Sequence, residues 1–242
     1  MYKITHNIQT IVYGLSLINK VSNPINSKLS SFSGVQEAGF VFPIRTIGKI
    51  PNEYLASIND SLNLLPDKVV NTINKNMYEI VVVDDICKAT KKFNIQTSKE
   101  AMPLAFTYSK GNDNIICFSN NIPSSLRKPA VFHEVGHSLD YIFNLSKQNE
   151  IKEAVSKDLK LIIKDRKLDS LSKNERERLN IYFMCNDVNS AVGEIVADLF
   201  AWQQNSGCYG TIYTTGKNNP NLMQNLFQNT NKALEILLAR LI

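Results

Sequence analysis

The chain has 242 residues, an apolar content of 43% and a formal net charge of +5, from 27 basic and 22 acidic residues. The length and apolar content suit one domain over residues 1–242, or two unequal halves that share a core. The basic residues are scattered and form no stripe interleaved with aromatic residues, which argues against nucleic acid as a partner. No apolar run approaches the roughly 18 residues that span a bilayer, so no membrane span is expected.

Residues 1–100 are expected to form an α/β subregion. Apolar residues at helical spacing predict an amphipathic helix over residues 4–18. Residues 39–47 have the composition of a strand, and the proline within them favours an edge position or a bend. Helical turns are expected on both sides of Pro66, and a β-branched run predicts a strand over residues 78–86.

The second part of the chain, residues 101–242, begins with a predicted β-hairpin. Two β-rich runs within residues 104–119 flank Gly111, Asn112 and Asp113, which supply turn chemistry. This hairpin comes shortly before the segment that contains two of the chain's 3 histidines.

From Pro129 onward the pattern is helical. Pro129 fits the first turn of a helix that runs to about Leu145. A lysine-rich amphipathic helix is predicted over residues 148–166, and residues 172–175 read SKNE, a capping box that opens another helix.

Two further helices are predicted toward the C-terminus. One covers residues 189–205. A last helix begins at Asn219 and Pro220, and its apolar residues are in register along one face: Leu222, Leu226, Ala233, Leu237 and Leu241. The expected fold class is therefore α+β, with a small mixed sheet and edge hairpin packed on one helix, followed by a mostly helical C-terminal half.

The 4 cysteines show no close pairing and no density typical of a disulfide framework. We expect free, buried thiols at Cys87, Cys117, Cys185 and Cys208.

The segment AVFHEVGHSLDY, residues 130–141, carries the strongest chemical signal. On a helix, His133 and His137 lie one turn apart on one face and can offer two imidazole nitrogens to one metal ion. Glu134 lies beside them, placed to take a proton from a water molecule at the metal. The same letters can also occur by chance in a helix, but histidine is scarce here and Gly136 costs helix stability, which favours a metal site.

A zinc site of this kind needs a third protein ligand. The metzincin pattern is excluded because Asp140 and Phe143 stand where that class has glycine and histidine. Cys117 lacks the local motif that a deformylase ligand requires. The remaining candidate is Glu194, with Asp198 one turn further on to hold a ligand histidine through its other ring nitrogen. The alternative is that both acids face solvent.

Asp140 lies one turn beyond His137 on nearly the same face. We expect it to anchor the neighbouring helix or a ligand histidine, and a plain salt bridge or cap is an equal alternative.

The stretches FHEVGHSLDY (residues 132–141) and GEIVADLFAW (residues 193–202) together resemble the gluzincins, the zinc peptidases with two histidine ligands and one glutamate. The closer resemblance is to the family of the anthrax lethal factor catalytic domain and the clostridial Pro-Pro endopeptidases. It extends over roughly residues 55–242 and depends mainly on the two stretches. It implies a zincin-like fold, in which the hairpin, the motif helix and the ligand helix follow in this order.

The resemblance also implies a role for each matching residue. His133, His137 and Glu194 would bind zinc, and Glu134 would be the general base. Asp198 would support a ligand histidine, at a position where the family usually has glutamate.

The chain departs from the family at the tyrosine that stabilises the oxyanion. The family places it two turns before the ligand glutamate, and seven residues before Glu194 stands Asp187. Tyr182 is the nearest candidate upstream, and Tyr209 and Tyr213 follow the ligand helix. We assign the role to Tyr182.

These residues predict a zinc-dependent endopeptidase that hydrolyses a peptide bond in a protein substrate. The substrate would bind as an extended strand along the hairpin edge. The resemblance implies a bacterial toxin, effector or secreted protease, so we expect secretion or delivery into a host cell, although no clear signal peptide is present. The alternative, motivated by the missing tyrosine, is a catalytically degenerate domain that binds a protein partner. A hydrolase of small amides is a third option, and the oligomeric state is left open.

Overall fold

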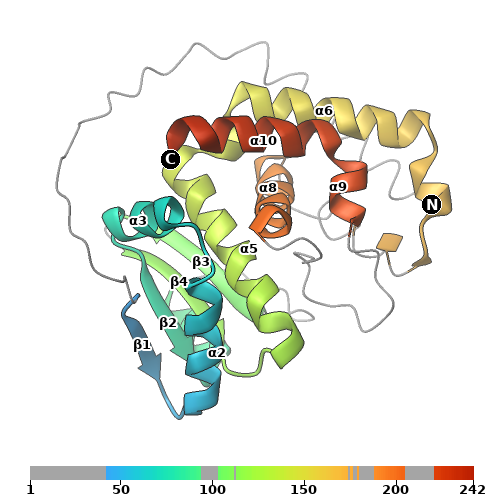
Figure 1. The fold of residues 1–242 in the computed structure, drawn as a ribbon. Coiled ribbons are helices and arrows are strands. Elements are labelled where there is room, and N and C mark those ends of the chain that lie inside the picture. Colours follow the sequence, from blue (N-terminus) through green and yellow to red (C-terminus); the bar gives the residue numbers. More distant parts are fainter. Residues whose placement is uncertain are drawn as a thin grey trace.

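A computed structural model of the protein describes residues 42–93, 103–111, 113–173, 175–176, 179, 188–204 and 221–242. Within these ranges the strands are β1 (Ile44–Ile47), β2 (Glu79–Val83), β3 (Ala105–Lys110) and β4 (Asp113–Ser119). The helices are α2 (Asn52–Leu62), α3 (Asp67–Lys75), α4 (Ile86–Lys92), α5 (Ser124–Phe143), α6 (Asn149–Lys164), α8 (Val188–Gln204), α9 (Leu222–Leu226) and α10 (Gln228–Leu241). Two short 3₁₀ turns are η1 (Leu145–Lys147) and η2 (Lys167–Ser170). The predicted α+β class and the mostly helical C-terminal half are confirmed (Figure 1).

The four strands form one mixed sheet in the order β1-β2-β4-β3. β1, β2 and β4 are parallel, and β3 is antiparallel to β4, so β1 and β3 are the two edges. Alternate side chains of β2 enter two different clusters, as the strand period requires: Ile80 packs into the larger core with α2 and α5, and Val81 packs against α4 on the opposite face. The larger core therefore lies between the sheet and α5.

The predicted strands over residues 39–47 and 78–86 correspond to β1 and β2, and the helical turns around Pro66 are α2 and α3. The hairpin prediction is also confirmed, because β3 and β4 meet at a turn where Gly111 has a φ of +63°. The amphipathic helix predicted over residues 4–18 lies outside the described residues.

The prediction for Pro129 was wrong in detail. α5 begins at Ser124, so Pro129 lies inside the helix rather than in its first turn. Proline removes one helical hydrogen bond, a cost that is offset here by burial: Pro129 and Ala130 are both buried against the core. The helix ends at Asn144, whose φ of +51° is the left-handed conformation that stops many helices.

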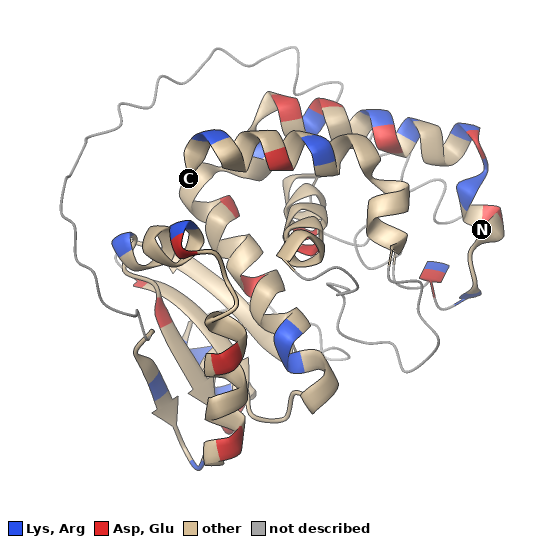
Figure 2. Ribbon diagram, viewed as in Figure 1, with Lys and Arg blue, Asp and Glu red and all other residues tan. Residues whose placement is uncertain are grey.

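The helical half keeps most of its predicted boundaries. The predicted helices over residues 148–166 and 189–205 are α6 and α8. The capping box is present: the Ser172 N–H donates to the Glu175 carboxylate at 2.7 Å, and the Glu175 N–H donates to the Ser172 hydroxyl at 3.3 Å. Acidic and basic residues alternate along α6 and α10 in Figure 2, so neither helix presents a basic stripe. None of the described helices is long and apolar enough to cross a membrane.

The single C-terminal helix predicted from Pro220 is in fact two helices, α9 and α10, with a break at Phe227. Asp158 of α6 causes the break. Its buried carboxylate accepts from the Thr230 N–H and hydroxyl, both at 2.8 Å, and from the Asn229 N–H at 3.2 Å. These are the free amides of a helix N-terminus, so Asp158 caps α10 and fixes its start.

Helices α5 and α8 touch through Gly136. A Cβ atom at Gly136 would lie 2.7 Å from the Ala197 Cα and 3.0 Å from the Ala197 carbonyl oxygen. Backbone atoms cannot move aside as a flexible side chain does, so only glycine allows this approach. The contact brings the motif helix and the ligand helix together.

We therefore expect Gly136→Ala to destabilise the protein. Overpacking costs typically 1–3 kcal/mol, and alanine regains only about 1 kcal/mol of helix propensity, so the net loss should be about 1–2 kcal/mol. Urea unfolding followed by circular dichroism measures it. Gly193→Ala is the control, because its Cβ would meet no backbone atom but only the end of a side chain, the Asp140 carboxylate, at the longer distance of 3.1 Å. Equal stability of wild type and Gly136→Ala would contradict the close contact.

The cysteine prediction holds for Cys117 and fails for Cys87. Both are free thiols, but Cys87 is exposed on α4, whereas Cys117 is fully buried in β4. Burial raises the pKa of the Cys117 thiol to about 12, with a further contribution from Glu134. Cys185 and Cys208 lie outside the described residues.

We expect iodoacetamide to label Cys87 and to leave Cys117 unlabelled in the folded protein, because the thiolate is the reactive species and Cys117 neither ionises nor meets solvent. Peptide mass spectrometry after labelling, with and without urea, measures this difference. Labelling of native Cys117 as fast as that of Cys87 would show that β4 opens readily.

Candidate metal centre

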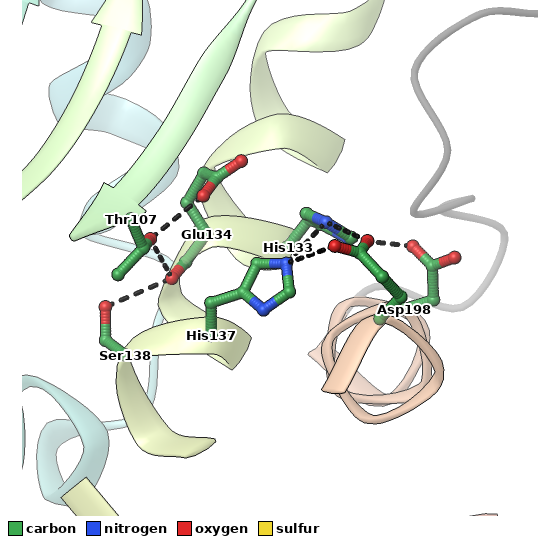
Figure 3. Close-up of polar contacts among 7 residues, drawn as sticks. Thr107, His133, Glu134, His137, Ser138 and Asp198 are labelled. Carbon is green, nitrogen blue, oxygen red and sulfur yellow. Dashed lines mark hydrogen bonds and ion pairs between the residues drawn. The ribbon is translucent and has the colours of Figure 1, made fainter. Parts of the chain in front are cut away.

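Four of the residues predicted to build the site converge between α5 and α8. His133 and His137 project from α5 toward α8, which carries Glu194 and Asp198 (Figure 3). One ligand atom from each of His133, His137 and Glu194 lies within 4.8 Å of the others. Helical spacing explains the arrangement, since residues four apart lie on one face and each helix presents such a pair to the other.

The ligand atoms lie at short distances from one another. His133 Nε2 is 3.0 Å from His137 Nε2 and 3.4 Å from Glu194 Oε2, and His137 Nε2 is 3.5 Å from Glu194 Oε1. A carboxylate offers only electron pairs and an imidazole nitrogen either an electron pair or one proton, so atoms this close need protons or a cation between them. The group could therefore hold a metal ion.

Asp198 fixes the orientation of His133. Its Oδ1 lies 2.8 Å from His133 Nδ1, and its side chain is fully buried. A carboxylate in this position requires a proton on Nδ1, which leaves Nε2 with its electron pair directed at the ligand group. Asp198 Oδ2 is buried and has no hydrogen-bond partner among the described residues. Asp198 therefore does not face solvent, contrary to the alternative drawn from the sequence.

The electrostatics of the group follow from burial and close opposite charges. Burial alone would lower the pKa of both histidines, but Asp198 and Glu194 raise the pKa of His133 well above its usual value, and Glu194 raises that of His137. Burial would raise the pKa of Glu194, but the two histidines lower it. The group thus attracts positive charge, and a metal ion would displace protons from it.

Glu134 is held beside the group and is only 3% exposed. Burial raises its pKa, and the two histidines and Thr107 oppose this shift. The Thr107 hydroxyl lies 2.9 Å from Glu134 Oε2 and 2.9 Å from the Glu134 main-chain oxygen (Figure 3). A carboxylate with a raised pKa is suited to accept a proton and release it again.

Asp140 makes the capping contact that was one of its two equal alternatives. Its Oδ1 accepts from the Ser146 N–H at 2.6 Å, so it holds the turn η1 that follows α5, and no contact with a ligand histidine is present among the described residues. The physical reason is the left-handed bend at Asn144, which turns the chain back toward Asp140. Tyr182 and Asp187 lie outside the described residues.

The Cys117 side chain does not point toward the ligand group, as the cysteine ligand of a deformylase site would have to. Its side chain packs with Val81 and Phe106 on the face of the sheet that α4 covers, opposite to α5. The deformylase pattern is therefore excluded by the direction of the side chain as well as by the sequence.

Two residues at the site were missed from the sequence. Thr107 contacts Glu134 from β3, and Ser138 donates its hydroxyl to the Glu134 main-chain oxygen at 3.0 Å. β3 reads AFTYSK, and the strand period places Ala105, Thr107 and Ser109 on one face. This alternation does not predict which element covers that face, so no sequence signal indicated the contact of Thr107 with α5.

Comparison with known proteins assigns no family. No protein-family model matches the chain, and no curated protein matches it.

Proposed function

We propose that the protein is a zinc-dependent endopeptidase. The single observation that supports this most strongly is the convergence of His133, His137 and Glu194 from two helices, with Glu134 beside them. Zinc bonds of about 2.0–2.1 Å in a tetrahedral arrangement place neighbouring ligand atoms about 3.3 Å apart. The two histidine nitrogens are 3.0 Å apart, and the two oxygens of Glu194 lie 3.4 Å from His133 Nε2 and 3.5 Å from His137 Nε2, which are distances of this size.

Three protein ligands leave one position of a four-coordinate ion for water or substrate, as in catalytic rather than structural zinc sites. Zinc at this point would supply Lewis acidity that polarises a carbonyl group and acidifies water. Glu134 would accept the proton of the attacking water and deliver it to the leaving amine. Asp198 would keep His133 in the tautomer that binds metal. Tyr182 remains our proposed donor to the oxyanion.

The substrate is proposed to be a protein or peptide segment bound as an extended strand. β3 is an edge of the sheet in the part of the chain that the structure describes, and Thr107 on this strand contacts Glu134. A peptide paired with β3 would thus run past the proposed base. Main-chain hydrogen bonds would supply affinity in such a complex.

The test is a peptide-library digestion with zinc-loaded wild type and Glu134→Ala in parallel, read by mass spectrometry, with zinc content measured on both samples. Cleavage by the wild type alone, with stoichiometric zinc in both, would support the proposal. Stoichiometric zinc without any cleavage would favour the alternative, a domain that binds a partner. A wild type that binds no zinc would refute the metal site itself.

A further inference from the structure

The outer edge of β3 has a defined register. The Leu104 carbonyl accepts from the Ser119 N–H of β4 at 2.8 Å. The main-chain groups of successive residues in an antiparallel strand point to alternate sides, so those of Leu104 face β4 and those of Thr107, three residues on, point away from it. The N–H and C=O of Thr107 therefore lie on the side of β3 where a substrate strand would pair.

The side chain of the same residue touches the proposed base. Thr107 Oγ1 carries one proton and lies 2.9 Å from two acceptors, the carboxylate and the main-chain oxygen of Glu134. The Ser138 hydroxyl already donates to that main-chain oxygen at 3.0 Å. A hydrogen bond to a charged acceptor is about twice as strong as a neutral one, so the Thr107 proton belongs on the carboxylate.

The buried position of Glu134 makes this bond important. With 3% exposure, its carboxylate has little water to hold it in place. Thr107 is the side-chain hydrogen-bond partner of this carboxylate among the described residues. The carboxylate therefore takes its position from β3 as well as from its own helix.

We propose that Thr107 is a positioning residue that links substrate binding to the base. Its main-chain N–H and C=O pair with the substrate strand, and its hydroxyl holds the Glu134 carboxylate in line with that strand. This inference rests on the proposed peptidase function and adds to it the residue that sets the substrate register against the base. A shift of β3 relative to α5 would therefore move the substrate strand away from the Glu134 carboxylate.

The test uses Thr107→Val and Thr107→Ser in the full chain, with a peptide identified by the digestion. Valine keeps the shape, the branched Cβ and the main-chain groups but removes the hydroxyl. Because misplacement of a reacting group by about 1 Å can cost about 10²-fold in rate, we expect Thr107→Val to lower kcat by roughly 10–100-fold and to leave KM within about threefold. Thr107→Ser keeps the hydroxyl and should retain kcat within about threefold of wild type.

A second readout needs neither metal nor substrate. In the metal-free protein, Thr107→Val should lower the urea midpoint of unfolding more in the presence of Glu134 than in the Glu134→Ala background, because the bond to the carboxylate exists only in the former, whereas the main-chain acceptor is present in both. Identical shifts in the two backgrounds would overturn the proposal, since they would assign Thr107 a packing role only.

The outcomes separate the two proposals. If the wild type cleaves nothing, the peptidase function fails and the role of Thr107 fails with it. If the wild type cleaves and Thr107→Val retains full kcat, only the role of Thr107 is overturned. Equal loss of kcat in Thr107→Val and Thr107→Ser would also overturn it, because the hydroxyl would then not be the group that matters.

Discussion

Glu134→Gln should lower kcat by at least about 100-fold while zinc binding and the fold remain intact, because a positioned general base contributes about 10²–10⁴-fold to the rate. Glutamine has nearly the same shape, so the helix and its packing are preserved. Its amide oxygen can still accept the Thr107 hydrogen bond that is now made to Glu134 Oε2 at 2.9 Å. It cannot accept a proton from water, which is the property that the mechanism requires.

Three measurements on one sample check this expectation: kcat with a cleaved peptide, zinc content and the urea midpoint. Stability should not fall, because the change removes a charge from a position that is 3% exposed. Glu153→Gln on α6 is the matched control, since the same chemical change at an exposed residue should leave all three quantities unchanged. Full kcat in Glu134→Gln would assign the proton transfer to another group and refute the mechanism.

Local sequence patterns were sufficient to predict the ligand group. His133 and His137 are separated by one helical turn, as are Glu194 and Asp198, and such spacing depends only on the helix itself. To predict that the two pairs face each other, the resemblance to a family with a known order of helices was also needed. The structure adds the physical cause, which is the close approach of α5 and α8 at Gly136.

Two features that could not be predicted depend on contacts between distant residues. The break between α9 and α10 has no proline or glycine to mark it, and it arises because Asp158, 71 residues earlier in the chain, binds the Asn229 amide. The contact of Thr107 with Glu134 likewise joins residues 27 positions apart. Sequence periodicity describes each helix or strand separately, so it predicts which face is apolar but not which polar atom will meet it.

Position 140 is a case in which the sequence left two roles equally open. The spacing from His137 to Asp140 is correct for a shared helical face, but the carboxylate binds the Ser146 N–H after the chain reverses at Asn144. Residues near a helix end can reach the following turn as easily as their own helix face. The spacing alone therefore could not decide between the two partners.

Substitution of Asp198 is expected to have a large effect on the affinity for zinc. We expect Asp198→Asn to weaken zinc binding by about 10-fold and Asp198→Ala by about 100-fold, the range typical of partners that orient a metal-binding histidine. Asparagine can still accept a hydrogen bond from His133 Nδ1, at the position where Asp198 Oδ1 is now 2.8 Å away, but it is neutral and makes the ring less basic. Alanine leaves the ring without this partner, so either ring nitrogen can carry the proton and part of the population presents an N–H to the metal.

Competition with a fluorescent zinc chelator measures these affinities on the metal-free variants, independently of any peptidase assay. Asp165→Asn, an exposed residue at the end of α6, is the control and should bind zinc as the wild type does. Unchanged affinity in both Asp198 variants would mean that the helix α5 alone orients His133. The Asp198 carboxylate is fully buried, and among the described residues its partner is His133 Nδ1, while its other oxygen has none. A buried charge is costly unless it is paired, so the carboxylate and the His133 ring are expected to depend on each other, and removal of the carboxylate should lower the zinc affinity.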